Sequence, residues 1–103
     1  MAKEISDAQF DQEIKTGTVF VDFWAPWCGP CLMMAPVFDK MSQKYPQIKF
    51  LKVNTTDNVE QAGKLGVTGI PCIIVFNEGK EVERLIGVRP ETAFEEAVKK
   101  YIS

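Results

Sequence analysis

The sequence predicts an α/β protein with a mixed β-sheet and helices on both faces of that sheet. Short runs of β-branched and aromatic residues alternate with stretches whose apolar residues recur every three to four positions. The last two runs follow each other through a turn, so one edge of the sheet should be antiparallel, while strands separated by helices should pair in parallel. At 103 residues and 46% hydrophobic content, the chain can bury one core, and we expect a single domain over residues 1–103.

The first third of the chain is expected to hold a helix and a buried strand, after a short strand near residues 3–5. Ser6 is a suitable N-cap for a helix in which Phe10 and Ile14 share one face. Residues 19–24 form a nearly continuous apolar run. Such a run is typical of a strand that is buried on both sides.

The middle of the chain is expected to form a long helix, a strand and a short helix. Apolar side chains recur at helical spacing over residues 28–45, and Pro36 inside this pattern should kink the helix. The next strand is predicted over residues 48–53. Asp57 or Asn58 can cap the short helix that follows.

The last third is expected to form a hairpin and a final helix. A strand over residues 70–76 leads through the turn at 77–80 into a strand over 82–86. Pro90 suits the first turn of the last helix, whose apolar residues again share one face.

Composition and charge exclude several classes of partner. A net charge of −2 with both signs interspersed gives no electrostatic basis for binding nucleic acid or an anionic membrane. No apolar run approaches the ~20 residues that a membrane-spanning helix needs. The N-terminus lacks the apolar core of a signal peptide, so we expect a cytoplasmic protein.

Two of the three cysteines, Cys28 and Cys31, lie three residues apart in the segment WAPWCGPC. Residues at this spacing on a first helical turn are close enough for a disulfide. As a structural staple the bond would close too small a loop to contribute much. A structural zinc site needs four ligands, and the chain has no histidine and only one further cysteine, Cys72. A metal shared between two subunits therefore remains only as a distant alternative, and we expect neither metal nor cofactor.

Redox chemistry fits the position of the pair between a strand and a helix. Unpaired N–H groups at a helix N-terminus favour an anion, which lowers the pKa of Cys28 and enriches its thiolate. Pro30 has no N–H to lose in the first turn. Cys31 should be more buried and more protonated. We therefore expect Cys28 to attack a disulfide and Cys31 to resolve the mixed disulfide.

The segment VDFWAPWCGPC resembles the active-site signature of the thioredoxin family. An Ile70-Pro71 pair follows at the family's spacing, and the resemblance extends from about residue 5 to the end of the chain. It implies the thioredoxin fold, with a mixed sheet in the order 1-3-2-4-5 and helices on both faces. It also implies general protein dithiol–disulfide oxidoreductase activity that requires no cofactor.

The resemblance assigns a role to a carboxylate in an otherwise apolar strand. Asp22 matches a buried aspartate behind the second cysteine, which manages the proton of Cys31 through water. A buried carboxylate is costly unless it has a purpose. Lys52 matches a lysine near this aspartate, although a solvated lysine at a strand edge is the plainer interpretation.

Further site residues also follow from the resemblance. Pro71 matches a cis-proline that faces the cysteines, and the Ile70 backbone would bind a substrate strand by β-addition. Trp27, Gly69, Ile70 and Gly87 would complete a shallow apolar groove around Cys28, whereas Trp24 should pack beneath it. The dipeptide Gly29-Pro30 tunes the redox potential and resembles that of reducing members.

Three positions depart from the family pattern. Leu32 stands where a basic residue is often found, Cys72 where threonine is usual, and Thr56 where aspartate is common. The first two could shift redox potential or partner choice. We expect Cys72 to be an inert buried thiol, because burial suppresses the thiolate.

The sequence thus predicts a monomeric protein-disulfide reductase that is itself re-reduced by a thioredoxin reductase of unknown type. Its other partners would be proteins that contain disulfides. Two alternatives stay open at this point. One is a disulfide isomerase or oxidase, and the other is a binding module that docks a partner polypeptide without using its cysteines.

Overall fold

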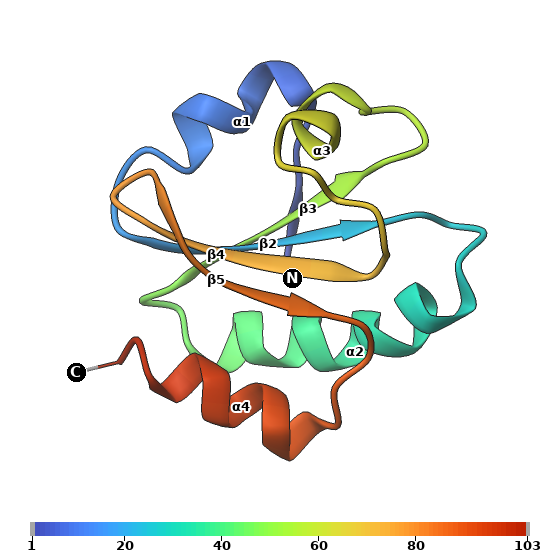
Figure 1. The fold of residues 1–103 in the computed structure, drawn as a ribbon. Coiled ribbons are helices and arrows are strands. Elements are labelled where there is room, and N and C mark those ends of the chain that lie inside the picture. Colours follow the sequence, from blue (N-terminus) through green and yellow to red (C-terminus); the bar gives the residue numbers. More distant parts are fainter. Residues whose placement is uncertain (1, 103) are drawn as a thin grey trace.

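A computed structural model of the chain, which describes residues 2–102, contains a five-stranded sheet between two layers of helices (Figure 1). The strand order is β1-β3-β2-β4-β5. β4 runs antiparallel to both of its neighbours, and the remaining strand pairs are parallel. The mixed sheet and its predicted order are confirmed. The elements are β1 (Lys3–Glu4), α1 (Asp7–Glu13), β2 (Thr18–Trp24), α2 (Gly29–Lys44), β3 (Lys49–Asn54), α3 (Glu60–Lys64), β4 (Cys72–Asn77), β5 (Lys80–Ile86) and α4 (Glu91–Lys99).

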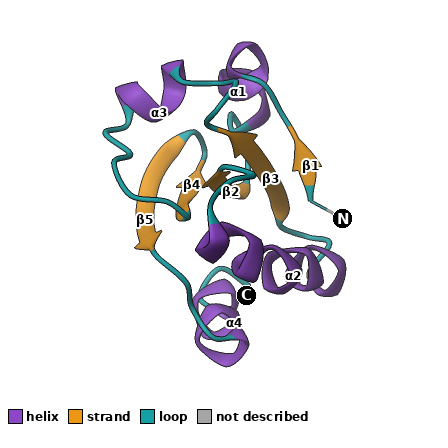
Figure 2. Ribbon diagram, turned by 90° about the vertical axis from the view of Figure 1, so that its right-hand side faces the viewer, coloured by secondary structure: helices purple, strands orange, loops and turns teal. Residues whose placement is uncertain are grey.

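The two faces of the sheet are covered by different helices. Figure 1 shows α1 and α3 on one face and α2 and α4 on the other, and Figure 2 shows the same layers after a quarter turn. Alternate residues of each strand point to opposite faces. On β2, for example, Val21 and Phe23 join the core beneath α1, while Phe20 joins Phe38 and Phe94 in the core beneath α2 and α4.

The short helix α3 begins differently from the prediction. Its N-cap is Val59, which makes no capping hydrogen bond with its side chain, so the prediction of a cap at residues 57–58 was wrong. The carboxylate of Asp7 takes that role from the start of α1. It accepts hydrogen bonds from the backbone N–H groups of Glu60 at 3.0 Å and Gln61 at 3.1 Å. This contact ties α3 to α1 across the same face of the sheet.

Two further boundaries bear on the site. Helix α2 is continuous through Pro36, and the kink expected there stays a prediction. β4 starts at Cys72 rather than at residue 70, so Ile70 and Pro71 lie in the loop before the strand. Within residues 2–102, no helix is both long and apolar enough to cross a lipid bilayer.

Candidate active site

Cys28 and Cys31 lie where β2 passes into α2. β2 ends at Trp24, and Cys28 is the N-cap residue of α2 with an extended backbone. The two cysteines form a disulfide, with their Cα atoms 5.2 Å apart. The backbone N–H of Cys31 points at Cys28 Sγ from 3.2 Å. This N–H is one of the groups that a helix leaves unpaired at its start, and it would stabilise negative charge on the sulfur.

The two sulfur-bearing residues are buried to different degrees. Cys28 is 6% exposed and Cys31 is 1% exposed. The expectation that Cys31 is more buried than Cys28 is therefore confirmed, although the difference in exposure is small. Both cysteines pack with Ala25 in a small cluster, against which Trp24 and Ile70 also lie.

The loop before β4 lies against the disulfide. The peptide bond between Ile70 and Pro71 is cis, as the resemblance implied. Cys28 Sγ lies 3.8 Å from the carbonyl oxygen of Ile70. The carbonyl of Pro71 accepts a hydrogen bond of 2.8 Å from the N–H of Gly87. Gly87 has φ +91°, a conformation that favours glycine. The structure therefore places Ile70 beside Cys28 and joins Gly87 to the adjoining Pro71.

Trp27 extends into solvent next to the cysteines and is 73% exposed. Its indole N–H donates a 3.0 Å hydrogen bond to the hydroxyl of Thr56, which follows β3. The sequence marked Thr56 only as a departure from the family pattern and gave no sign of this contact. The exposed indole and the Ile70 loop provide apolar surface near Cys28.

Further residues near the cysteines are exposed on the loop before Ile70 and on the first turns of α2. Gly69 is exposed and precedes the Ile70 loop, while Gly29 and Pro30 are exposed in the first turn of α2. Leu32 and Met33 follow Cys31 on α2, and both are exposed apolar side chains. Sequence reasoning considered Leu32 but missed Met33, whose position in the helical pattern carried no signal of function.

Asp22 is fully buried in the centre of β2, as expected. Within residues 2–102, neither of its carboxylate oxygens has a hydrogen-bond partner. Burial raises the pKa of Asp22 from 3.8 to about 7, and the positive charge of Lys52 opposes this rise. A carboxyl group with a pKa near neutrality can both accept and return a proton.

Lys52 lies beside Asp22 because the two residues are paired in the parallel ladder of β2 and β3. Paired residues in neighbouring strands project to the same face of the sheet. The Lys52 ammonium lies 4.6 Å from the centre of the Trp24 ring, which is a cation–π contact. Lys52 is thus half-buried beside Asp22, on a strand that is paired on both sides, and is not a solvated lysine at a strand edge.

Cys72 is a free thiol, 1% exposed, at the start of β4. Burial raises its pKa above the ordinary value. Its side chain belongs to the core beneath α1 and α3, with Phe23 and Phe76. Burial and a raised pKa both disfavour a reactive thiolate.

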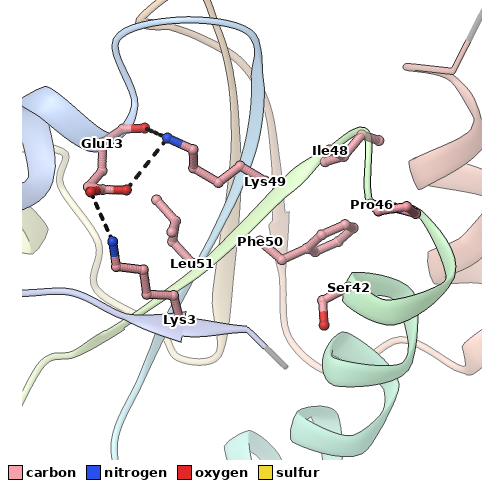
Figure 3. Close-up of a pocket in the computed structure, with 8 residues that line it drawn as sticks. All are labelled: Lys3, Glu13, Ser42, Pro46, Ile48, Lys49, Phe50 and Leu51. Atoms are coloured by element: carbon pink, nitrogen blue, oxygen red, sulfur yellow. Dashed lines mark hydrogen bonds and ion pairs between the residues drawn. The ribbon is translucent and has the colours of Figure 1, made fainter.

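A surface pocket of about 570 Å³ lies at the other end of the sheet (Figure 3). It opens near the start of β3, whereas the cysteines follow the end of β2, which runs parallel to β3. Glu13 spans the pocket by pairing with Lys3 and Lys49. None of the predicted site residues lines this pocket, whose lining consists of Lys3, Glu13, Ser42, Pro46, Ile48, Lys49, Phe50 and Leu51.

No group of three or more potential metal ligands of the types His, Cys, Asp and Glu is gathered in the described part of the chain. What the site contains is a cysteine pair that can be oxidised, placed at a helix N-terminus with a buried acid in the strand before it. This arrangement on an α/β sheet defines the class of dithiol–disulfide oxidoreductases.

Comparison with known proteins assigns the family within this class. The sequence model of the thioredoxin family matches residues 1–100. The chain is 42% identical to the thioredoxin of Listeria monocytogenes over 103 residues, which covers 99% of this chain and 100% of that protein. It is also 42% identical to the thioredoxin of Bacillus subtilis over 98 residues, covering 94% of each. A solved structure of Plasmodium falciparum thioredoxin superposes with a TM-score of 0.91 at 34% identity, covering 97% of this chain and 99% of that one.

The chain belongs to the thioredoxin family. It is a protein-disulfide oxidoreductase with the activity of a protein-disulfide reductase.

Proposed function

We propose that Cys28 attacks the disulfide of a client protein and that Cys31 then releases the client in its reduced form. The observation that carries this assignment is the position of Cys28 at the N-cap of α2, with the Cys31 N–H directed at its sulfur from 3.2 Å. A thiolate at this position gains from the unpaired N–H group and from the helix dipole. Cys31 is more buried and so less accessible to a client disulfide, which suits it to act in the second step.

The two steps balance as thiol–disulfide exchange. The Cys28 thiolate forms a bond to one client sulfur, and the client disulfide breaks, so that its other sulfur leaves as a thiolate and takes up a proton. Cys31 then loses its proton and attacks Cys28 Sγ, which breaks the mixed disulfide, and the second client sulfur leaves as a thiolate and takes up a proton. The client gains two electrons and two protons, and Cys28 and Cys31 end as the disulfide.

Asp22 is proposed to receive the proton of Cys31, with a solvent molecule as carrier. It is buried on the face of the sheet that α2 covers, and its pKa of about 7 suits proton exchange near neutral pH. Lys52 is paired with Asp22 in the ladder and carries the opposite charge. It would therefore lower the free-energy cost of ionising Asp22 in the folded protein.

The client is proposed to bind across the groove around Cys28. The exposed indole of Trp27 would provide one wall, and the loop of Gly69, Ile70 and Pro71 the other. The backbone at Ile70 would pair with an extended client segment by β-addition. Gly87, held to Pro71 by its N–H, would leave the approach free of a side chain.

The family implies two kinds of partner, a reductase and proteins that contain disulfides. We place the protein in the cytoplasm as a monomer and treat residues 1–103 as one domain. The reducing equivalents would come from a thioredoxin reductase that returns the Cys28–Cys31 disulfide to the dithiol. The Gly29-Pro30 dipeptide, exposed in the first turn of α2, would set the potential of this couple.

Trapping of mixed disulfides tests this order of attack. Reduced Cys31→Ser should accumulate a stable adduct with insulin, in which Cys28 is joined to an insulin cysteine, while Cys28→Ser should form none. Cys72→Thr, which keeps both motif cysteines, is the control and should turn over without an adduct. An adduct through Cys31 in Cys28→Ser would reverse the assigned roles. Biological function that survives loss of both cysteines would favour the binding-module alternative.

A further inference from the structure

Three charged residues form a row across three strands on one face of the sheet. In the ladder of β1 and β3, Glu4 is paired with Lys52, and in the ladder of β2 and β3 the same Lys52 is paired with Asp22. Paired residues project to the same face. On β2 and β3 this is the face of Phe20 and Phe50, which the core beneath α2 and α4 contains. Lys52 therefore stands between two carboxylates.

The ammonium of Lys52 does not hydrogen-bond to Asp22, since both Asp22 oxygens lack a partner within residues 2–102. It lies over the Trp24 ring at 4.6 Å. From this position its positive charge acts on both carboxylates. Desolvation raises the pKa of Glu4 above its ordinary value, and Lys52 opposes that rise, as it does for Asp22.

The other ionisable groups near Asp22 come from the remaining elements around it. Glu4 and Asp39 of α2 each place a negative charge near Asp22 that raises its pKa, and Asp39 accepts a hydrogen bond of 3.3 Å from the Ala2 N–H. The thiol of Cys72 on β4 is also influenced by the Asp22 charge. Among the groups that shift the pKa of Asp22, Lys52 is the one that lowers it. A group that attracts the Lys52 ammonium therefore also changes the pKa of Asp22.

We propose that Glu4 is a positioning residue for the cysteine chemistry: it competes with Asp22 for the Lys52 ammonium, so that Asp22 holds its proton more tightly than Lys52 alone would allow. The proposal rests on the proposed role of Asp22 as the proton acceptor for Cys31. A carboxylate fully compensated by Lys52 would be too weak a base for a thiol, since proton transfer is most efficient when the acceptor titrates near the operating pH. Glu4, at the exposed edge of the sheet, would thus act on the site across two strand spacings.

The experiment measures the titration of Asp22 itself in the reduced full-length protein. The side-chain carboxyl ¹³C resonance of Asp22, assigned by its loss in Asp22→Asn, is followed from pH 5 to pH 9. In Glu4→Gln the midpoint should fall by about 0.7 to 1 unit. Direct repulsion by one charge about 10 Å away in water accounts for only about 0.3 unit of this fall, and the rest is the attraction of Lys52 that Glu4 no longer draws away. An unchanged midpoint would overturn the proposal.

Two further variants separate competition for Lys52 from other effects. Glu13→Gln removes the same charge from a glutamate of α1 that binds Lys3 and Lys49 (Figure 3), and it should leave the Asp22 midpoint unchanged. In a Lys52→Met background, Glu4→Gln should shift the midpoint by less than half as much as in the wild type. A full shift in that background would mean simple repulsion and would contradict competition for Lys52.

The proposal also predicts a change in the pH–rate profile of mixed-disulfide resolution. In Glu4→Gln the acid limb of that profile should move to lower pH by the same amount as the Asp22 midpoint. A moved midpoint with an unmoved profile would mean that Asp22 does not serve Cys31, and the proposed proton acceptor would be wrong while the coupling of Glu4 to Asp22 stood. An unmoved midpoint in a protein that still reduces insulin would refute the role of Glu4 alone.

Discussion

Asp22 and Lys52 are direct neighbours in the parallel ladder of β2 and β3, yet the lysine does not neutralise the acid by a hydrogen bond within the described chain. The ammonium lies over Trp24 instead. Because burial outweighs the attraction between the charges, the pKa of Asp22 rises to about 7. The protein therefore carries an acid whose ionisation opposes folding.

This acid should make the protein less stable as pH rises. Protonation of Asp22 in the folded state contributes stability that is full below its unfolded pKa of 3.8 and is lost as pH rises through about 7. Asp22→Asn cannot ionise, so its free energy of unfolding relative to wild type should increase by on the order of 2 to 3 kcal/mol between pH 5 and pH 8. Urea unfolding of the oxidised proteins at each pH measures this difference.

The exposed Asp11 of α1 offers a matched control for that measurement. Asp11→Asn removes the same charge from an exposed position, so its stability should run parallel to that of the wild type across the whole pH range. Parallel stability profiles for Asp22→Asn and the wild type would show that Asp22 is a well-compensated structural acid.

The hydrogen bond between Trp27 and Thr56 should matter for client binding more than for stability. Thr56→Val keeps the shape of the side chain and removes the hydroxyl, so the exposed indole would lose its 3.0 Å anchor. We expect KM for a protein disulfide to rise about two- to fivefold, as for loss of one hydrogen bond worth about 0.5–1 kcal/mol. Steady-state kinetics with insulin checks this, and Thr56→Ser should restore the wild-type KM. An equal loss in reduction of a small-molecule disulfide would place the effect on the chemistry and not on client binding.

Local patterns predicted the elements of this fold well. Apolar periodicity identified the strands and main helices, and the strand–CGPC–helix order located the cysteine pair. Contacts between distant segments could not be predicted in this way, because no local pattern indicates that residues 7 and 60 are in contact. The cap of α3 by Asp7 and the bond from Trp27 to Thr56 depend on how the sheet is assembled. The neighbours of Lys52 likewise follow only once the ladder registers are known.

The cap that Asp7 provides for α3 should contribute measurable stability. Asp7→Ala removes the acceptor for the N–H groups of Glu60 and Gln61, which should cost about 0.5–2 kcal/mol of unfolding free energy. Denaturant unfolding of this variant, beside Asp11→Ala from the same helix, measures the effect. Equal stability of the two variants would mean that α3 does not depend on the Asp7 carboxylate.

Cys72 should be dispensable for the reaction. Its side chain is buried in the core beneath α1 and α3, and burial raises its pKa, so it should supply little thiolate. Cys72→Thr should keep reductase activity within about twofold, as expected for a near-isosteric change away from the reacting sulfurs. Mild oxidation of the wild type should leave one free thiol, assigned to Cys72 by mass mapping. A disulfide from Cys72 to Cys28, Cys31 or another chain would instead make it a redox participant.

The midpoint potential of the Cys28–Cys31 couple tests most directly whether this protein works as a reductase. The reduced and oxidised forms are quantified by alkylation and mass mapping after equilibration with dithiothreitol or glutathione buffers of known potential. Cys72→Thr serves as the background in which no third thiol takes part. A reductase of this family should give a potential near ~−270 mV, whereas a value of about −180 mV or higher would indicate an isomerase or oxidant and would contradict the account.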